Sequence, residues 1–137
     1  MGFPRFTERP SGASGSTRVS NRDEGLRGEE TAIKTLKRQG YKIVERNHRN
    51  RLGEIDVIAE EGGCLVFVEV KKRNTERFGE AVCAVDERKK HHLIRTALLY
   101  MKMHDCFGRS IRFDVIGIDK ERTKLVKNAF LVEEEHR

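Results

Sequence analysis

The most constraining feature of the sequence is a β-rich run at residues 64–71, Cys-Leu-Val-Phe-Val-Glu-Val-Lys. Side chains alternate between the two faces of a strand, so Leu65 and Phe67 share a face with Glu69 while valines line the other. A strand that is apolar on both faces belongs in the middle of a sheet that is covered on both sides. A carboxylate there is costly unless a cation or hydrogen bonds meet it. We therefore expect Glu69 to have partners, and Lys71 on the same face is one candidate.

A second β-rich run, residues 55–59, precedes the first across Gly62-Gly63, a dipeptide typical of a tight hairpin turn. A two-residue turn there places Asp56 directly opposite Glu69. Like charges on opposed residues destabilise a sheet unless something positive lies between them. Carboxylate oxygens suit Mg²⁺ or Mn²⁺ better than zinc, so a divalent cation is the natural partner. The alternative, a solvated ion-pair face, is disfavoured by the apolar side chains beside Glu69.

A third carboxylate falls on the apolar side of a helix that we expect to run from Asp23 or Glu24 to a stop at Gly40. At roughly 100° per residue, Glu29 lies at the centre of the apolar stripe, whereas Glu30 lies toward the charged side. The stripe is formed by Leu26, Ala32, Ile33 and Leu36. A single inward glutamate is more often a satisfied structural residue than a ligand. Convergence with two other carboxylates and a lysine favours a functional site.

The remaining elements complete an α/β pattern. Residues 41–46 alternate like a strand, and Asp86 is a good N-cap for a helix that reaches about Met103. A fourth strand is expected at residues 111–118, and a short fifth strand is expected within residues 124–132. The order αβββαββ, without an internal repeat, predicts a central mixed β-sheet of about five strands flanked by helices.

Composition limits the class of protein. The chain has 137 residues and a formal net charge of +6, and half of that charge comes from residues 1–22, where four arginines stand against one acid. That segment also holds both prolines and four serines, so we expect a disordered basic arm followed by a single domain over residues 23–137. The chain has no apolar run long enough to span a membrane, and its three cysteines lack zinc or disulfide spacing. We expect a soluble, cytoplasmic protein with reduced, mostly buried thiols.

Basic residues flank the carboxylates in the sequence, where contacts to phosphate would be useful. They are Arg46, His48, Arg49 and Arg51 before the second strand and Lys72, Arg73 and Arg77 after the third. In the second helix, Lys89 or Lys90 would either reach DNA or extend from the edge of the apolar stripe into solvent. The alternative for each of them is an ordinary solvated charge.

An acid in one strand followed by Glu-x-Lys in the next strand resembles the PD-(D/E)xK, or restriction-endonuclease-like, nucleases. The match to the bacterial YraN-like family is closer and covers about residues 25–132. It is carried by Gly28-Glu29, Gly40-Tyr41, Arg46-Asn47, Gly53-Glu54-Ile55-Asp56-Val57-Ile58-Ala59, Val66-Phe67-Val68-Glu69-Val70-Lys71, Arg73, Ala84-Val85 with Lys89, Arg112-Phe113-Asp114-Val115 and Asn128-Ala129-Phe130. The leading proline of the nuclease motif is replaced by Ile55, which removes no ligand.

The resemblance implies a restriction-endonuclease-like fold similar to that of archaeal Holliday-junction resolvases. It also implies a metal site of Glu29, Asp56 and Glu69 with Lys71 as a fourth catalytic residue. Mg²⁺ or Mn²⁺ would serve as the cofactor for hydrolysis of DNA, including branched or junction DNA. A homodimer is compatible with this reading, because related nucleases with one site per chain often pair. The rival is a non-catalytic nucleic-acid-binding protein with the same fold, and a third, weaker possibility is an enzyme acting on a small phosphate ester.

Overall fold

The protein is described from a computed structural model, in which residues 21–72, 85–119 and 122–132 are placed. Within these residues, two helices and five strands follow the predicted order αβββαββ. Their bounds are α1 (Asn21–Arg38), β1 (Lys42–Asn50), β2 (Gly53–Glu61), β3 (Cys64–Lys72), α3 (Glu87–Met103), β4 (Ile111–Asp119) and β5 (Arg122–Phe130). Neither helix has the length and hydrophobicity of a membrane span.

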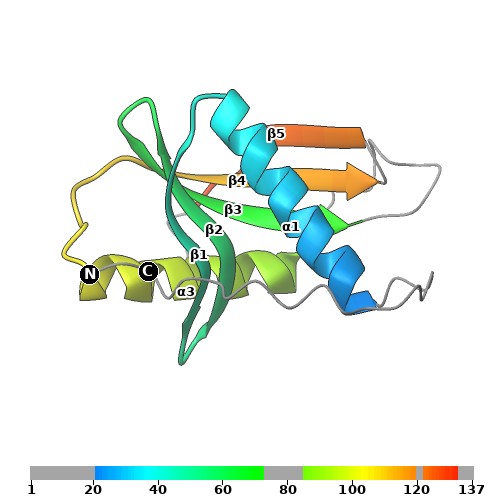
Figure 1. The fold of residues 1–137 in the computed structure, drawn as a ribbon. Helices are drawn as coiled ribbons and strands as arrows, with labels where there is room; N and C mark the ends of the chain where they lie inside the picture. The colour runs from blue at the N-terminus through cyan, green and yellow to red at the C-terminus, as the bar shows by residue number, and fades with distance from the viewer. Residues whose placement is uncertain (1–20, 73–84, 120–121, 133–137) are drawn as a thin grey trace, which may run out of the picture.

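The five strands form one mixed sheet in the order β1-β2-β3-β4-β5. The β3–β4 pair is parallel and its strands are linked through α3, whereas the other neighbouring pairs are antiparallel. Figure 1 shows α1 crossing one face of the sheet and α3 lying along the other. The predicted mixed sheet flanked by helices is therefore confirmed, with β3 in its centre.

Local signals in the sequence explain the turns and helix ends. Gly62 and Gly63 have φ of 59° and 80°, the left-handed values that a two-residue hairpin turn requires. Gly40 ends α1 with φ of 92°, and the Asp86 side chain caps α3 by accepting a hydrogen bond from the Lys89 amide at 2.8 Å. The fifth strand is one element, interrupted by a register shift, rather than the short strand expected. The proposed arm at residues 1–22 falls almost wholly outside the described residues.

Two apolar clusters hold the layers together. One packs α3 against the sheet and includes Phe67, Phe113 and Tyr100, whose rings stack or meet edge to face. The other packs α1 on the opposite face and includes Leu36 and Val68. Because β3 contributes fully buried side chains to both clusters, it is covered on both faces, as the sequence predicts. Cys64 and Cys106 are free but only partly buried, so the expectation of mostly buried thiols is not met for them.

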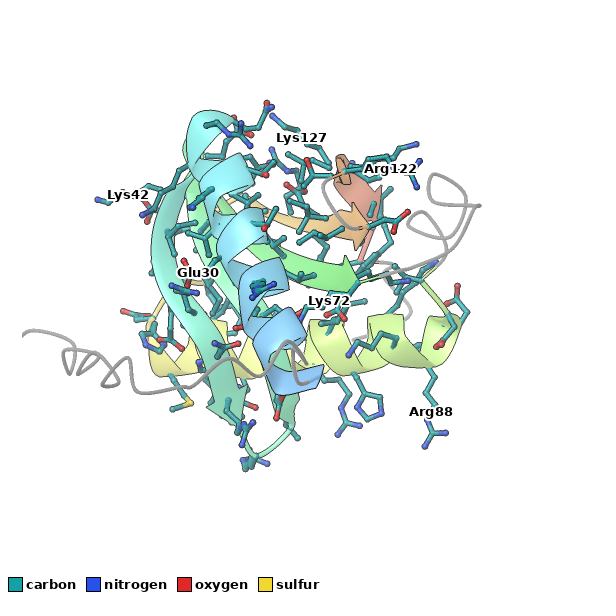
Figure 2. All side chains as sticks on the ribbon, turned by 45° about the vertical axis from the view of Figure 1, so that its right-hand side comes forward. Glu30, Lys42, Lys72, Arg88, Arg122 and Lys127 are labelled. Carbon is teal, nitrogen blue, oxygen red and sulfur yellow. The ribbon has the colours of Figure 1, made fainter. Side chains whose placement is uncertain are left out.

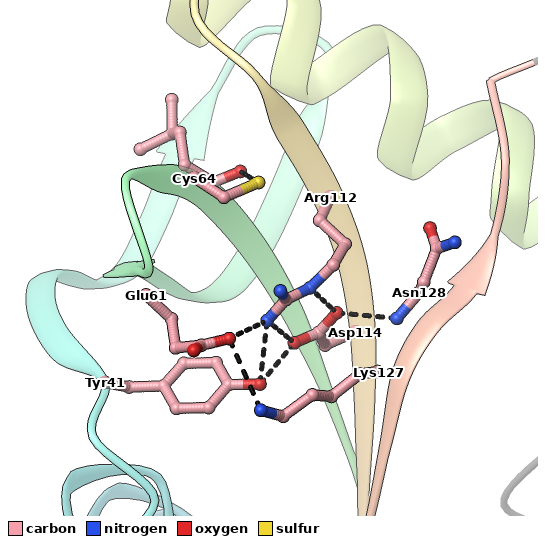
Figure 3. A network of polar contacts seen from close by, with 8 residues as sticks. Tyr41, Glu61, Cys64, Arg112, Asp114, Lys127 and Asn128 are labelled. Atoms are coloured by element: carbon pink, nitrogen blue, oxygen red, sulfur yellow. Dashed lines mark hydrogen bonds and ion pairs between the residues drawn. The ribbon is translucent and has the colours of Figure 1, made fainter.

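A buried polar network fastens the far end of α1 to the sheet (Figure 3). Arg112 of β4 donates through Nε and Nη2 to the two carboxylate oxygens of Asp114, each at 2.8 Å. The Tyr41 hydroxyl donates to Asp114 Oδ2 at 2.5 Å, and the Asn128 amide donates to Oδ1 at 2.9 Å. Burial and the Asp114 hydrogen bond raise the pKa of Tyr41. Asp114 is 1% exposed, so its charge depends on these donors.

We expect Asp114→Ala to lower the free energy of unfolding by about 3–5 kcal/mol, because it leaves Arg112 without its main counter-ion in a largely buried position. Urea unfolding followed by circular dichroism measures this loss. Glu61→Gln is the matched control, since Glu61 meets the same guanidinium at 2.9 Å from a more exposed position and should lower the free energy of unfolding much less. Equal effects of the two substitutions would contradict this account of the network.

Candidate metal and nucleic-acid site

The β2–β3 ladder ends where the predicted site begins. Pairing runs from Glu61↔Cys64 to Val57↔Val68, as the two-residue turn predicts. Asp56 is the next residue, and its Oδ2 accepts a hydrogen bond from the Val70 amide at 2.8 Å. The Asp56 carboxylate thus accepts a hydrogen bond of the kind that a backbone carbonyl of the neighbouring strand accepts in a regular ladder. Asp56 and Glu69 are thus aligned in register but stand just beyond the ladder, rather than forming the ordinary cross-strand pair expected.

The regular alternation of β2 also changes at Asp56. Ile55 packs in the α3-side cluster, whereas Val57 packs in the α1-side cluster. Residues two apart on a regular strand share a face, so the chain shifts faces at this point. Asn47, which lies between the β1 partners of Ile55 and Val57, has φ of 51°, a left-handed value that is uncommon outside glycine. The irregularity spans both strands and directs Asp56 toward β3.

Burial dominates the electrostatics of Asp56 and Glu69. Only 12% of the Glu69 side chain is exposed. Burial, followed by the negative charge of Asp56, raises the pKa of Glu69 to about 7. Burial also raises the pKa of Asp56, and the charge of Glu29 adds to that rise, while the Val70 amide and Lys89 oppose it. The two carboxylates therefore occupy one low-dielectric region in which both are costly to ionise.

Glu29 reaches this region from α1, on the side of the sheet opposite α3. It is half-buried, and its charge is close enough to influence Asp56. The residue before it, Gly28, is buried, and a Cβ there would lie 2.7 Å from Cε of Lys72. Glycine thus lets the Lys72 side chain cross the surface of α1. Glu30 points elsewhere and pairs with Arg46 at 2.6 Å, as its position toward the charged face predicts; Figure 2 shows Glu30 and Lys72 on opposite sides of α1.

Three lysines accompany the three carboxylates. Lys71 lowers the pKa of Glu69 and Lys72 lowers that of Asp56, each through its positive charge. Lys89 acts on both carboxylates, and its Nζ lies 3.4 Å from Glu69 Oε1. The structure therefore brings together Glu29, Asp56, Glu69 and Lys71, the residues predicted from the sequence, and adds Lys89 from α3 as a direct partner of Glu69.

The donor set suits magnesium or manganese. Mg²⁺ is commonly held by one or two carboxylates with water and phosphate oxygens completing its shell, so it does not need an all-protein cage. Asp56 and Glu69 provide such a pair. Within residues 21–72, 85–119 and 122–132, no three His, Cys, Asp or Glu side chains are gathered as a ready-made metal centre. Glu29 would thus act from longer range or through water.

Some of the residues predicted to bind phosphate are exposed, whereas others are already paired with acidic side chains. Arg49 and Arg51 are exposed near the β1–β2 turn, although Arg49 pairs with Glu54 at 2.8 Å. Arg46 is paired with Glu30, and Lys72 is exposed. Arg73 and Arg77 lie outside the described residues.

The expectation that His48 would contact phosphate is wrong. His48 is 7% exposed and packs edge to face on Tyr100, with ring centroids 5.0 Å apart. Its two ring nitrogens contact Glu45 and Asn50. The apolar alternation of β1 is too weak to reveal this inward orientation, which depends on packing against α3.

The fold and the site define a class: a small α/β protein with a central mixed sheet, in which partly buried carboxylates meet lysines at the end of the middle strand. The profile of Uncharacterised protein family UPF0102 matches residues 28–118, and this chain belongs to that family. This confirms the resemblance to the YraN-like family.

Relatives in that family match over most of their own length. A UPF0102 protein of Persephonella marina is 40% identical over 107 residues, which are 78% of this chain and 92% of the relative. One of Syntrophomonas wolfei is 44% identical over 114 residues, 80% of this chain and 99% of the relative. One of Myxococcus xanthus is 40% identical over 100 residues, 73% of this chain and 79% of the relative. The carboxylate-bearing strands all lie inside the matched family region.

We expect the metal-free protein to lose stability as the pH rises from about 5 to 8. The pKa of Glu69 is raised to about 7, so the folded state binds this proton more tightly than the unfolded state, and ionisation favours unfolding. Glu69→Gln should flatten this dependence and raise the Tm near pH 8. Thermal melts in EDTA across this range measure both effects. The exposed Glu54→Gln serves as the control, and identical pH profiles for wild type and Glu69→Gln would contradict the assignment.

Proposed function

We propose that this protein is a metal-dependent endonuclease that hydrolyses phosphodiester bonds of DNA, including branched or junction DNA. The observation that carries the proposal is the meeting of Asp56 and Glu69 beyond the last pair of the β2–β3 ladder, beside lysines from β3 and α3. A purely structural role does not account for two partly buried carboxylates kept close enough for the charge of Asp56 to act on Glu69. The resemblance to PD-(D/E)xK nucleases and archaeal Holliday-junction resolvases supports the same reaction class.

Each residue would then have a role in the reaction. Asp56 and Glu69 would hold the cation, Glu29 would add a third negative charge, and Lys71 would help to position and activate the attacking water. When bound, Mg²⁺ or Mn²⁺ supplies Lewis acidity, which lowers the pKa of water and offsets the charge that develops on phosphorus. The Asp56–Val70 hydrogen bond fixes one carboxylate oxygen of Asp56 at 2.8 Å from the backbone, leaving the other oxygen for the cation.

The DNA backbone would be held on both sides of these carboxylates. Arg46, Arg49 and Arg51 lie on β1 and its turn, while Lys72 ends β3 and Lys89 lies in α3. Arg73, which follows Lys72 in the sequence, is a further candidate. Contacts of this kind position the duplex without reading its sequence. A homodimer would supply a second site for cutting the opposite strand.

We expect Asp56→Asn to reduce DNA cleavage by at least about a hundredfold, because the amide can still accept from Val70 but carries no charge to hold the cation. The substrates are linear, single-stranded, flapped and four-way-junction DNA with Mg²⁺ or Mn²⁺. Glu60→Gln is the matched control, since Glu60 is a more exposed acid near the opposite end of the same strand and pairs with Arg109 at 3.2 Å.

Thermal melts help to distinguish a metal-dependent endonuclease from a non-catalytic nucleic-acid-binding protein with the same fold. Mn²⁺ should raise the Tm of wild type and leave Glu69→Ala unmoved, because only a folded site binds the ion. Binding of DNA without cleavage of any substrate, with no response to Mn²⁺, would replace the enzyme with the non-catalytic binding protein.

We expect the double substitution Arg49→Ala/Arg51→Ala to weaken DNA binding about equally on all sequences. The slope of log affinity against log salt should fall by about 2, since two phosphate contacts are lost. Fluorescence anisotropy in Ca²⁺ at several salt concentrations measures the slope. Lys42→Ala, an exposed lysine at the other end of β1 (Figure 2), should leave the slope unchanged. Equal slopes for wild type and the double variant would exclude this end of the β1–β2 hairpin from the interface.

A further inference from the structure

Lys89 occupies a position in α3 where a cation is unfavourable for the helix itself. Asp86 is the N-cap and accepts from the Lys89 amide at 2.8 Å, which places Lys89 third in the helix. That position favours glutamate or glutamine, whose side chain can return to the N-cap amide, and the positive end of the helix dipole disfavours a lysine. The stability of α3 therefore does not explain a lysine at this position.

The carboxylate pair does explain it. Lys89 Nζ lies 3.4 Å from Glu69 Oε1, a contact that joins the first turn of α3 to the end of β3. Lys71 acts mainly on Glu69 and Lys72 on Asp56, whereas Lys89 lowers the pKa of both carboxylates. Its side chain is 48% exposed, so it can leave this position without disturbing the core.

A divalent cation held by Asp56 and Glu69 would need the same carboxylate oxygens. An ammonium and a dication close to the same oxygen repel each other strongly in a region of low dielectric. We propose that Lys89 is a built-in counter-ion of the carboxylate pair, which holds Glu69 in the metal-free protein and competes with the divalent cation for it. The inference rests on the proposed metal site, and it adds that Lys89 sets the metal concentration at which that site fills.

The neighbouring lysine provides a matched comparison. Lys90 is also in the first turns of α3, but its Nζ lies 3.0 Å from Glu87 and 5.9 Å from the centre of the Phe130 ring. Removal of its charge alters the same end of the helix, and the acid that loses its partner is Glu87 instead of Glu69. Lys89→Arg keeps the positive charge and provides the conservative rescue.

Isothermal titration with Mn²⁺, in the absence of DNA, tests the proposal on the full chain. Lys89→Met should bind Mn²⁺ roughly tenfold more tightly than wild type, since a competing charge is gone. Lys89→Arg and Lys90→Met should stay within about twofold of wild type. The rise in Tm caused by a fixed Mn²⁺ concentration should also be larger in Lys89→Met than in wild type.

The outcomes are distinct. If wild type binds Mn²⁺ and Lys89→Met binds it equally or more weakly, the counter-ion role is overturned while the metal site stands. If neither protein binds Mn²⁺, both the counter-ion role and the metal site of the proposed function fail. If only Lys89→Met binds, the counter-ion role is supported in its strongest form, with Lys89 excluding the ion from the wild-type protein.

Discussion

The hydrogen bond from the Val70 amide to the Asp56 carboxylate is the interaction on which the site depends. It satisfies a backbone donor that would otherwise lose its partner where β2 and β3 part, and it uses a charged acceptor, which makes a stronger bond than a neutral carbonyl. The ladder can therefore end inside the sheet without leaving a buried amide unpaired. Glu69 then stands beside Asp56 instead of being shielded by a regular strand pair.

Charged groups from both faces of the sheet act on Asp56, at the point where the β2–β3 pairing ends. β2 changes face between Ile55 and Val57, so Asp56 is influenced both by Glu29 and Lys72, on the α1 side, and by Lys89, on the α3 side. A regular hairpin would have placed both carboxylates on one face of the sheet. The sheet that bears this cost is stabilised by the Arg112–Asp114 pair near the far end of α1 and by apolar packing on both faces.

Much of this could be predicted from the sequence, because the decisive signals are local. Two glycines at the turn set the register, the apolar run at residues 64–71 requires a central strand, and a register count aligns Asp56 with Glu69. The early end of the ladder, the Lys89–Glu69 contact and the burial of His48 could not be predicted. Each depends on how α3 and β1 pack against the sheet, and residues that are 20 or more positions apart in sequence carry no periodic signal of their contact. Arg112 and Asp114 alternate with apolar residues of β4, which was a usable sign of a buried ion pair.

The charges at the candidate site are more informative than the net charge of the whole chain. Glu29, Asp56 and Glu69 bring three negative charges to the end of β3, and Lys71, Lys72 and Lys89 bring three positive ones, so their formal charges balance. Such a site does not attract a phosphate strongly until a further cation is added. A divalent ion would tip the balance to positive within a region of low dielectric, where charges act most strongly. Under the proposed function, metal binding and DNA binding at this site would be linked: each would favour the other, by the same free energy in both directions.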